Sequence, residues 1–374
     1  MASSGEEPVR RRWHALTIAT VSRSLALQSP EAWHVLGERG YDITFVAARD
    51  AWTEALAARY PGTTFEEIRA ERRLRPGPLL DLAGRLRALS RRDWDLVQVQ
   101  SPIISVLWRL VATRRSRRRT VYVVHGFHFQ PGERSIRALA VRLLEGALAH
   151  RTMAVATVSK ADHDFVARLP RYLGPRVLAA LPGAGVPVDD HRAAHSGTRP
   201  APDPYALFVG DLNANKDPLC AVDAVEACRR RGLQLDLVVI GEGPLAGALA
   251  QAARTRPWLH RVERSDTVPQ WMAHAEVLLA PSHREGLPRV IIEALATGTP
   301  VVARENRGSA ELLSDRMGQV LTSGEADAWA DAIGTALGSV PDTDAMWDRA
   351  EAYGVERFRV VYGNMVAQLE ALRG

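Results

Sequence analysis

Residues 281–303 read PSHREGLPRVIIEALATGTPVVA. An apolar run at Val277–Ala280 precedes this stretch and another at Pro300–Ala303 ends it, so each is predicted to be a strand. A helix is predicted between them from about Pro288, because proline suits the first helical turn, where its missing N–H would have no partner. The order strand, loop, helix, strand is typical of an open α/β sheet, in which ligands bind at the loops that leave the strands.

Two glutamates in this stretch are candidate binding residues. Glu285 lies in the predicted loop, and Glu293 lies about two turns into the predicted helix. The free N–H groups of a first helical turn make a site for phosphate, and a carboxylate is a good acceptor for sugar hydroxyls. Phosphate and sugar recognised together indicate a sugar nucleotide. Two exposed glutamates at a helix end are the alternative, which the complete motif disfavours.

The whole segment resembles the donor-site signature of glycosyltransferase family 4, whose members are retaining enzymes of the GT-B fold. By this resemblance Glu285 is a catalytic residue that binds hydroxyls of the donor sugar, and Glu293 binds the ribose of the nucleotide. The resemblance also assigns donor binding to the residues that follow the first glutamate, which are Gly286, Leu287, Pro288 and Arg289. The nearest match is the subgroup that builds exopolysaccharides and capsules.

A second match lies at residues 208–217, FVGDLNANKD, which read as a strand that ends in a polar loop. This segment resembles the second diphosphate-binding element of the family, which implies donor binding by Gly210, Asn215 and Lys216. Lys216 is implied to be catalytic, because a lysine can neutralise charge that grows on the leaving diphosphate. Only two of the 48 basic residues are lysines, which favours a chemical requirement for this one.

Asp211 departs from the family, many of whose members have arginine directly after the turn glycine. A second cation is therefore expected from elsewhere. Arg284, Arg289 and Arg307 are the candidates, and Arg289 is preferred because it falls in the first turn of the predicted helix. Solvated surface arginines are the alternative. The exopolysaccharide subgroup has an acidic residue at this point, so Asp211 is compatible with activity, although it leaves open a non-catalytic partner subunit.

Residues 125–129 read HGFHF and follow an apolar run, Thr120–Val124, that is predicted to be a buried strand. A histidine at the carboxyl end of a strand, followed by glycine, is well placed to face a cleft. The same string occurs in the resembled subgroup, where the first histidine reaches the reacting sugar, so His125 is implied to be catalytic. His128 and the phenylalanines are expected to shape the loop. A metal site at His125 and His128 is the alternative, which the lack of a nearby cysteine or acidic third ligand at a usual spacing disfavours.

The length of 374 residues predicts two domains, since single cores seldom exceed about 250–300 residues. Strands and helices alternate along both halves, which predicts an α/β fold with parallel sheets. The resemblance implies the GT-B arrangement of two Rossmann-like α/β/α domains facing across a cleft, with a C-terminal helix that crosses back to the first domain. The expected segments are a first domain at 1–186 with a helix at about 355–374, a linker at 187–204, and a donor domain at 205–354.

Nine strands and one long final helix are predicted in this frame. The strands are Ala15–Val21, Asp42–Ala47, Asp95–Val99, Val121–Val124 and Ala154–Val158 in the first half, and Ala206–Gly210, Leu235–Ile240, Val277–Ala280 and Val301–Ala303 in the second. The loops at residues 20–24 and 100–102 are expected to face the acceptor. The final helix is predicted to run without a break over Met346–Leu372.

Charge is unevenly distributed along the chain. Residues 1–190 carry a net charge of +10 and residues 191–374 one of −5. An anionic membrane surface or a pyrophosphate-bearing lipid would attract the first half, and a solvated arginine-rich surface is the alternative. No nucleic-acid-binding module accompanies the charge, so nucleic acid is not an expected partner. The two cysteines have neither metal nor redox spacing, and with no signal pattern or apolar run of about 20 residues the cytoplasm is the expected compartment.

Three further motifs offer alternative functions. Residues 241–246, GEGPLA, fit the dinucleotide-binding pattern, with Glu263 about twenty residues on, so a dehydrogenase is a rival; a turn of this kind also matches the glycosyltransferase family. Residues 162–164, Asp-His-Asp, imitate a metal-binding motif but are expected in the first turn of a helix. Glu311 is expected to open a helix rather than to catalyse.

Together these features predict a retaining transfer of a hexosyl unit from a nucleotide diphosphate sugar, with a UDP-sugar as the expected donor. The acceptor is a hydroxyl of a saccharide, a lipid-linked saccharide or a natural product. The resemblance implies that neither a cofactor nor a metal is needed, and that the donor phosphate itself takes the acceptor's proton. A GT-B-fold epimerase would use the same donor site without an acceptor, and a partner subunit would bind nucleotide weakly or not at all.

Overall fold

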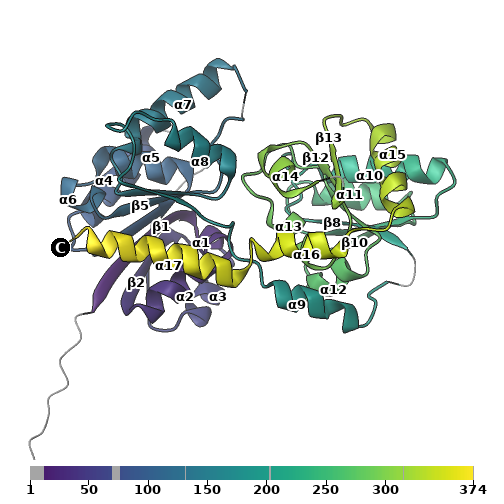
Figure 1. Ribbon diagram of the computed structural model, residues 1–374, viewed down its shortest axis with the longest axis horizontal. Coiled ribbons are helices and arrows are strands. Elements are labelled where there is room, and N and C mark those ends of the chain that lie inside the picture. The colour runs from purple at the N-terminus through teal and green to yellow at the C-terminus, as the bar shows by residue number, and fades with distance from the viewer. Residues whose placement is uncertain (1–11, 70–75, 131, 202–203, 315, 374) are drawn as a thin grey trace, which may run out of the picture.

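The computed structural model describes residues 12–69, 76–130, 132–201, 204–314 and 316–373. Two α/β domains lie side by side, and the last helix lies across the first of them (Figure 1). The predicted fold class is thereby confirmed. The first domain contains β1 (Trp13–Val21), α1 (Ser22–Gln28), α2 (Pro30–Glu38), β2 (Tyr41–Ala48), α3 (Thr53–Arg59), β3 (Thr64–Glu67), α4 (Pro76–Leu89), β4 (Leu96–Gln100), α5 (Pro102–Val111), α6 (Arg114–Arg117), β5 (Thr120–Val124), α7 (Ile136–Ala149), β6 (Ala154–Thr157), α8 (Lys160–Ala167) and β7 (Val177–Ala180).

The second domain repeats the alternation of strands and helices. It contains α9 (Val188–Ala193), the 3-10 turn η1 (Ala194–Ser196), β8 (Tyr205–Val209), α10 (Pro218–Arg230), β9 (Asp236–Ile240), α11 (Ala246–Ala253), β10 (Leu259–Val262), α12 (Val268–Ala273), β11 (Val277–Ala280), α13 (Arg289–Ala296), β12 (Val301–Arg304), α14 (Arg307–Leu312), β13 (Gly318–Leu321), α15 (Ala326–Gly338) and α16 (Thr343–Glu351). Helix α17 (Val355–Ala371) then returns to the first domain.

Both sheets are parallel, and both reverse their strand order at one point. The orders are β3-β2-β1-β4-β5-β6-β7 and β10-β9-β8-β11-β12-β13. The reversal falls between β1 and β4 in the first sheet and between β8 and β11 in the second. Ligands of such sheets bind in the crevice beyond the carboxyl ends of the strands at this reversal. The loops after these four strands are therefore the expected walls of the site.

The central strands were predicted and the outermost strands were not. Strands β4 and β5 are buried along their whole length, because helices cover both faces of a parallel sheet. Strand β5 (TVYVV) reads as an almost continuous apolar run, whereas β4 (LVQVQ) also buries Gln98 and Gln100. The strands at the sheet edges, β3, β7, β10 and β13, were absent from the prediction. Strands β3 (TFEE) and β10 (LHRV) contain polar and exposed residues. Strands β7 (VLAA) and β13 (GQVL) are short and mostly half-exposed.

The final helix is broken, contrary to the prediction of one helix over Met346–Leu372. Helix α16 ends at Glu351 and α17 begins at Val355, with Gly354 before it. At the break, the N–H of Val186 donates to the carbonyl of Tyr353 and the N–H of Val355 donates to the carbonyl of Val186, both at 3.1 Å. The two chain crossings between the domains are thus hydrogen-bonded to each other, which requires the backbone to leave the helix there.

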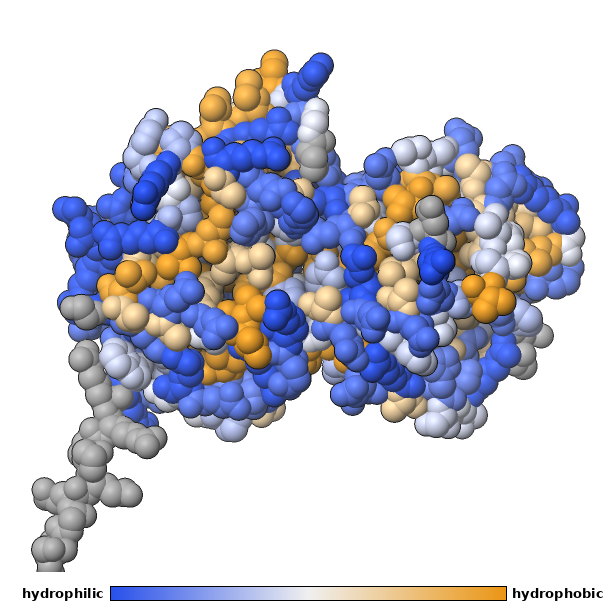
Figure 2. Space-filling view, in the orientation of Figure 1, coloured by the Kyte–Doolittle hydropathy of each residue, from blue (hydrophilic) through white to orange (hydrophobic). Residues whose placement is uncertain are grey.

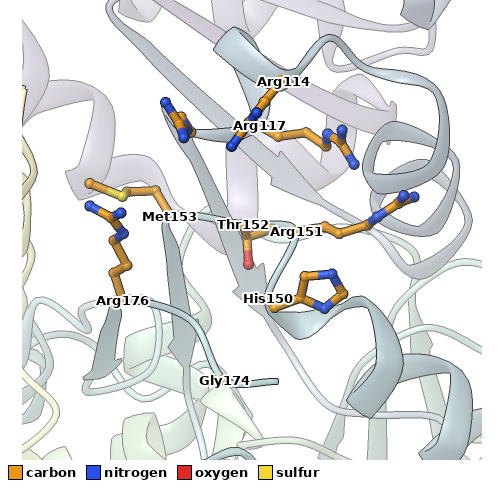
Figure 3. A pocket seen from close by; sticks show the side chains of 9 residues that line it. Arg114, Arg117, His150, Arg151, Thr152, Met153, Gly174 and Arg176 are labelled. Carbon is orange, nitrogen blue, oxygen red and sulfur yellow. The ribbon is translucent and has the colours of Figure 1, made fainter. Parts of the chain in front are cut away.

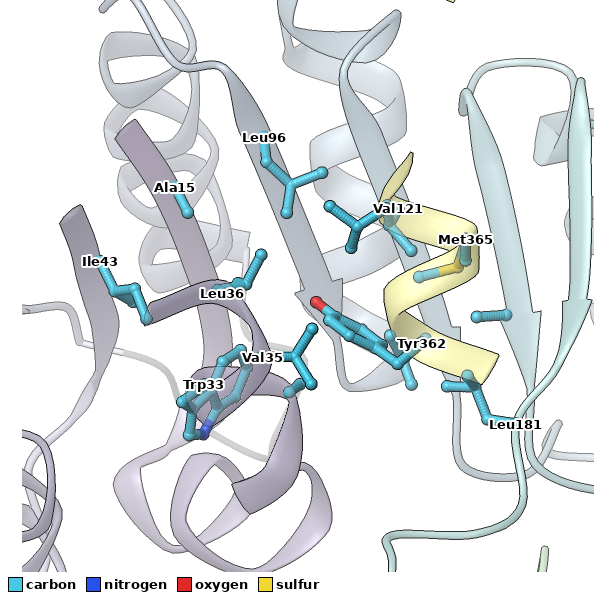
Figure 4. Packing of buried hydrophobic residues seen from close by; sticks show 14 of the residues in the cluster. Ala15, Trp33, Val35, Leu36, Ile43, Leu96, Val121, Leu181, Tyr362 and Met365 are labelled. Carbon is cyan, nitrogen blue, oxygen red and sulfur yellow. The ribbon is translucent and has the colours of Figure 1, made fainter. Parts of the chain in front are cut away.

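Helix α17 completes the core of the first domain. It contributes the buried side chains of Phe358, Tyr362, Met365, Val366 and Leu369 to a cluster that contains strand residues of β1, β2, β4, β5 and β6. Figure 4 shows Tyr362 and Met365 beside Val121 and Leu181. Burial of side chains of this size stabilises by about 2 kcal/mol each, so the helix belongs energetically to the first domain.

The segment expected as a linker, residues 187–204, is largely helical in its described part. Helix α9 packs against α12 and α13 of the second domain, and His195 Nε2 donates a 2.6 Å hydrogen bond to the carbonyl of Thr297. Near the start of the chain, Ser29 separates α1 from α2, and Pro30 opens α2. Over the described residues, no helix combines the length and the apolar character needed to cross a membrane.

Candidate active site

The loop after β8 is held in shape by its own side chains. The side-chain oxygen of Asn213 accepts hydrogen bonds from the backbone N–H groups of Asn215 and Lys216, at 2.9 and 3.0 Å. Asp217, which precedes α10, has a φ of +51°, a conformation that strains residues other than glycine. Gly210 lies at the start of the loop, beside the aliphatic stem of Lys216. The loop thus presents Lys216 in one defined position.

The loops after β8 and β11 are joined at their tips. Lys216 Nζ lies 2.5 Å from Glu285 Oε1, with both side chains mostly buried. Beside this ion pair, Asn215 Nδ2 donates to the carbonyl of Arg284 at 3.0 Å, and the N–H of His283 donates to the carbonyl of Asn215 at 2.8 Å. Three residues predicted from two separate motifs, Asn215 and Lys216 from one and Glu285 from the other, therefore meet in one place.

The other predicted donor-binding residues lie in helix α13 and directly before it. It begins at Arg289, with Pro288 as the residue before it, and Arg289 Nε donates to Glu293 Oε1 at 2.7 Å. Leu287 packs into the cores of both domains and faces Gly183. A Cβ added to Gly183 would stand 3.0 Å from Leu287 Cδ2. Arg289 and Glu293 thus form a pair of their own, and Leu287 contributes its side chain to the contact between domains.

Two hollows meet at His125, which follows β5. The first, of about 260 Å³, is lined by residues of both domains, including His125, Asn215, Arg284 and Glu285. The second, of about 420 Å³, is lined by first-domain residues alone, among them Thr20, Ser24, Gln28, Ser101 and Ile103. His125, Gly126 and His128 border both. The predicted catalytic histidine therefore lies between the loops of the second domain and a separate hollow of the first domain.

The hydrogen bonding of His125 defines its chemical state. Its Nε2 lies 3.1 Å from Gln100 Oε1, and an amide oxygen can only accept, so Nε2 carries the proton and donates. Ser29 Oγ donates to the same amide oxygen at 3.1 Å. Burial lowers the pKa of His125 to about 4. At neutral pH the ring is therefore uncharged, and its Nδ1 is left as an acceptor.

The two domains touch backbone to backbone beside this histidine. A Cβ on Gly286 would stand 1.8 Å from the carbonyl oxygen of His125, and one on Gly126 would stand 3.0 Å from the Cα of Gly286. Gly126 also has a φ of +137°, which side chains rarely adopt. Both glycines are needed for the domains to approach this closely, so Gly286 of the family signature acts here through its lack of a side chain.

A cation from the first domain faces Asp211. Arg23, the second residue of α1, places Nη2 2.5 Å from Asp211 Oδ1, and both side chains are partly exposed. The second cation was expected from Arg284, Arg289 or Arg307, and Arg23 was not among the candidates. The pairing depends on a contact across the cleft between residues 188 positions apart, for which the sequence holds no local signal.

The other candidate cations have different surroundings. Arg284 is exposed at the wall of the first hollow. Arg307 is buried and reaches into the first domain, where its Nη1 lies 2.9 Å from Asp162 Oδ1 and its Nη2 donates to the carbonyl of Phe129. Asp162 belongs to the first turn of α8, as expected, and is engaged by this ion pair. Among the described residues, no cluster of three or more histidine, cysteine or acidic side chains is arranged to hold a metal ion.

Glu311 also contributes to the contact between domains rather than opening a helix. It lies within α14, and its carboxylate accepts a 2.7 Å hydrogen bond from the backbone N–H of Lys160, at the start of α8. Burial raises the pKa of Glu311. Together with Arg307–Asp162, this contact fixes the second domain against α8 in the closed arrangement.

The glycines of the GEGP turn serve the packing of the second domain. A Cβ on Gly241 would stand 1.9 Å from the carbonyl oxygen of Gly210, and one on Gly243 would stand 2.5 Å from that of Leu212. In a dinucleotide-binding turn, a glycine leaves space for the pyrophosphate. Here the backbone of residues 210–212 occupies that space, so the dehydrogenase reading loses its main support.

Comparison with solved structures identifies the class. HepE from Anabaena, in complex with UDP and glucose, matches with a TM-score of 0.71 at 19% identity, covering 96% of this chain and 100% of its own. Sucrose-phosphate synthase from Thermosynechococcus elongatus matches with a TM-score of 0.70 at 17% identity, covering 96% and 100%. At these identities the likeness concerns the fold, which is that of the GT-B glycosyltransferases.

Comparison of sequences then gives the family. Residues 34–174 match the family described as Glycosyltransferase Family 4, and residues 203–339 match Glycosyl transferases group 1. The protein belongs to glycosyltransferase family 4, as its motifs predicted, and is therefore a glycosyltransferase enzyme.

Curated relatives agree with this assignment. Putative glycosyltransferase EpsD from Bacillus subtilis (strain 168) is 26% identical over 253 residues, which are 64% of this chain and 66% of EpsD. D-inositol 3-phosphate glycosyltransferase from Paenarthrobacter aurescens (strain TC1) is 27% identical over 313 residues, which are 75% of this chain and 74% of the relative. The matches therefore span about two thirds to three quarters of these relatives.

Proposed function

We propose that this enzyme transfers a hexosyl unit, with retention of configuration, from a nucleotide diphosphate sugar to a hydroxyl of an acceptor. The observation that carries the proposal is the meeting of two hollows at His125, with the Lys216–Glu285 pair on the donor side. The donor would enter between the domains and the acceptor would occupy the first-domain hollow. The reacting carbon would then lie beside His125.

A UDP-sugar is the proposed donor, and a saccharide, a lipid-linked saccharide or a natural product is the proposed acceptor. HepE, the structural relative, is described in complexes with UDP and with UDP-glucose. An Escherichia coli relative, 24% identical over 59% of this chain and 60% of its own, is named as a galactosyltransferase that acts from UDP-Gal on a diphosphoundecaprenol-linked sugar. The enzyme would work in the cytoplasm, in peripheral contact with an anionic membrane, without a cofactor or metal.

In the proposed reaction, the bond from C1 of the sugar to the diphosphate oxygen breaks, and a bond from C1 to the acceptor oxygen forms on the same face. The acceptor's proton passes to the leaving diphosphate, so no protein base is required. Lys216 would stabilise the negative charge that develops on that diphosphate, and Glu285 would bind sugar hydroxyls. The uncharged ring of His125 suits this scheme, because its free Nδ1 can accept a hydrogen bond from a sugar hydroxyl.

Calorimetric titration tests the donor assignment. The full chain and the variant Glu293→Ala are titrated with UDP, UDP-glucose, UDP-N-acetylglucosamine, GDP-mannose and NADH. A lost hydrogen bond to the ribose should raise the dissociation constant of the bound nucleotide about tenfold and change kcat less. Glu356→Ala, which removes an exposed carboxylate of α17, is the matched control and should bind normally.

Each contrary result of this titration favours one alternative. Absence of binding to any sugar nucleotide would favour the partner subunit, and binding of NADH alone would favour a dehydrogenase. Conversion of a UDP-sugar without any acceptor would favour an epimerase. Unchanged nucleotide affinity in Glu293→Ala, with normal binding otherwise, would contradict only the ribose role of Glu293.

A further inference from the structure

Helix α7 presents a row of large apolar side chains to solvent. Ile136, Leu139 and Leu143 are spaced three and four residues apart, so they share one face of the helix, and their exposed fractions are 88%, 53% and 66%. Leu144, at 41%, widens the row. Figure 2 shows hydrophobic surface along the upper edge of the first domain, where Figure 1 has α7. A surface helix of a globular protein normally turns such a face to the core, so this row calls for a partner.

A strongly basic hollow of about 380 Å³ lies where α7 ends (Figure 3). Its charged lining consists of Arg114, Arg117, Arg118, His150, Arg151 and Arg176. It opens at the amino ends of β5, β6 and β7, which is the edge of the sheet opposite to the catalytic cleft. It is therefore a separate feature from the donor and acceptor hollows.

The charges of this arginine hollow are uncompensated within the described chain. Among the described residues, no acidic side chain lines the hollow and none of its five arginines pairs with a carboxylate, whereas neighbouring Arg115 and Arg119 both pair with Asp93. Burial, together with the charges of Arg151 and Arg114, lowers the pKa of Arg117. Like charges gathered in this way repel one another, and an anion in the hollow would relieve the repulsion.

The arginine hollow and the apolar row adjoin through helix α5. Arg151 Nη1 donates to the carbonyl of Arg109 at 3.3 Å, and the next residue of α5, Leu110, is 49% exposed. Helix α5 is fastened to α7 by the buried ion pair of Arg109 and Glu145, at 2.7 Å. Apolar and cationic surface are thus joined on one flank of the first domain.

We propose that the α7 row and the arginine hollow together dock the first domain on a bilayer that contains anionic phospholipids. Phosphate groups of the lipids fill the hollow, and the α7 row enters the boundary between headgroups and acyl chains. Charge complementarity selects this partner, because a bilayer supplies both an apolar layer and a dense array of negative phosphates. The surface lies outside the cleft, so this inference does not depend on which donor the enzyme uses.

Docking on this flank would also set the height of the acceptor hollow above the bilayer. Helix α5 begins at Pro102, which lines the acceptor hollow, and ends beside the arginine hollow. Its ten residues span about 15 Å. An acceptor anchored in the bilayer by a lipid could therefore reach the hollow without leaving the membrane surface.

Vesicle flotation of the full chain tests the proposal. Vesicles of phosphatidylcholine alone are compared with vesicles that also contain phosphatidylglycerol, at low and high salt. The protein should float with the anionic vesicles at low salt and be released by high salt. The exposed pair Arg114→Ser/Arg118→Ser should weaken binding about thirty-fold, from about 1 kcal/mol per arginine near an anionic surface. Leu139→Gln/Leu143→Gln should also weaken it, and size-exclusion chromatography and circular dichroism check folding.

Matched controls use the second domain. The exposed arginines in Arg230→Ser/Arg254→Ser and the exposed apolar residue in Val340→Gln should leave vesicle binding unchanged. Equal binding to neutral and anionic vesicles, no binding to either, or full binding by both test variants would overturn the proposal. The proposal would also be overturned if the protein were a dimer that Leu139→Gln/Leu143→Gln dissociates without loss of vesicle binding. Binding of soluble inorganic phosphate without binding of vesicles would overturn it as well. Hydrolysis of a soluble donor stays the same in all variants if the cleft is intact, which separates this test from that of the proposed function.

Discussion

The two walls of the cleft are built differently. On the side proposed to bind the donor, side chains such as Asn213 and Asn215 bind backbone groups and lock two loops of the second domain together. On the side proposed to bind the acceptor, the hollow is lined by first-domain side chains from separate segments, including Thr20 and Ser101. Ser101 alone of these is strained, with a φ of +84°. A fixed backbone suits a ligand part that every member of a family shares, whereas a lining of independent side chains can change with the acceptor.

The largest expected effect comes from removing the positive charge of Lys216 from the wall that is proposed to bind the donor. Lys216→Ala should lower kcat about 1,000-fold, because the developing charge on the diphosphate loses its cation. The only other lysine gives the control: Lys160→Ala removes an exposed side chain that pairs with Asp164 and should leave kcat unchanged. Steady-state kinetics with the donor identified by titration measure both. A similar loss in both variants, or none in Lys216→Ala, would contradict the role of Lys216.

The second prediction tests the close backbone contact between the two walls at Gly286. In Gly286→Ala the new methyl group would collide with the carbonyl of His125, so the domains cannot close fully. Misplacement of reacting groups by about 1 Å can cost about 100-fold in rate, and a loss of this size in kcat is expected, with a smaller change in nucleotide affinity. Gly247→Ala in α11, where a Cβ meets nothing within 4 Å, is the control. Full activity of Gly286→Ala would show that the closed contact is not needed for turnover.

A third, smaller effect tests the ion pair that bridges the walls. Exposed pairs contribute at most about 1 kcal/mol, so Arg23→Ala should lower kcat/KM about fivefold, and high salt should reduce the difference. The exchanged pair Arg23→Asp/Asp211→Arg should recover most of this loss, whereas each single substitution should not. This double-mutant cycle gives a coupling energy. A coupling of zero would mean that Arg23 and Asp211 act independently.

The smallest expected effect is an absence of pH dependence. The pKa of His125 is lowered to about 4 from an ordinary value near 6.5, so the native ring stays uncharged as the pH falls through 6.5. The pH profile of kcat/KM should therefore show no inflection near pH 6.5 that is due to His125. The profiles of the wild type and of His125→Gln should have the same shape in this range. The free energy of unfolding that the uncharged His125 ring contributes follows the same shift. This contribution is fully present above pH 6.5 and is lost as the pH falls toward 4, because the unfolded chain binds the proton first. Denaturation at several pH values compares the wild type with His125→Gln.

The fold could be predicted from sequence where burial leaves a pattern. Central strands such as β8 (YALFV) and β11 (VLLA) are apolar runs, and the alternation with helices implies parallel pairing. The break before α17 could not be predicted, because the apolar spacing continues on both sides of it. That break is required by the hydrogen bonds that Val186 makes with Tyr353 and Val355. Edge strands such as β3 were missed because they are too polar to be distinguished from loops.

The candidate site could be predicted where its residues are contiguous. Asn215, Lys216, Glu285 and His125 belong to short strings, and the structure brings them to one hollow and its walls. Arg23 could not be predicted, because its partner lies in the other domain. The pairing of Arg289 with Glu293 concerns residues one turn apart on a helix, so the spacing alone could have indicated it.

The return of α17 to the first domain constrains the order in which the protein can fold as it is synthesised. The five side chains that α17 buries in the first core leave the ribosome after the whole second domain has been made. Until then the first domain has its seven strands but a cavity along one side of its sheet. The first domain is thus translated first, but its core is completed last. An arrest of translation within α15 or α16 would leave that apolar groove open to chaperones.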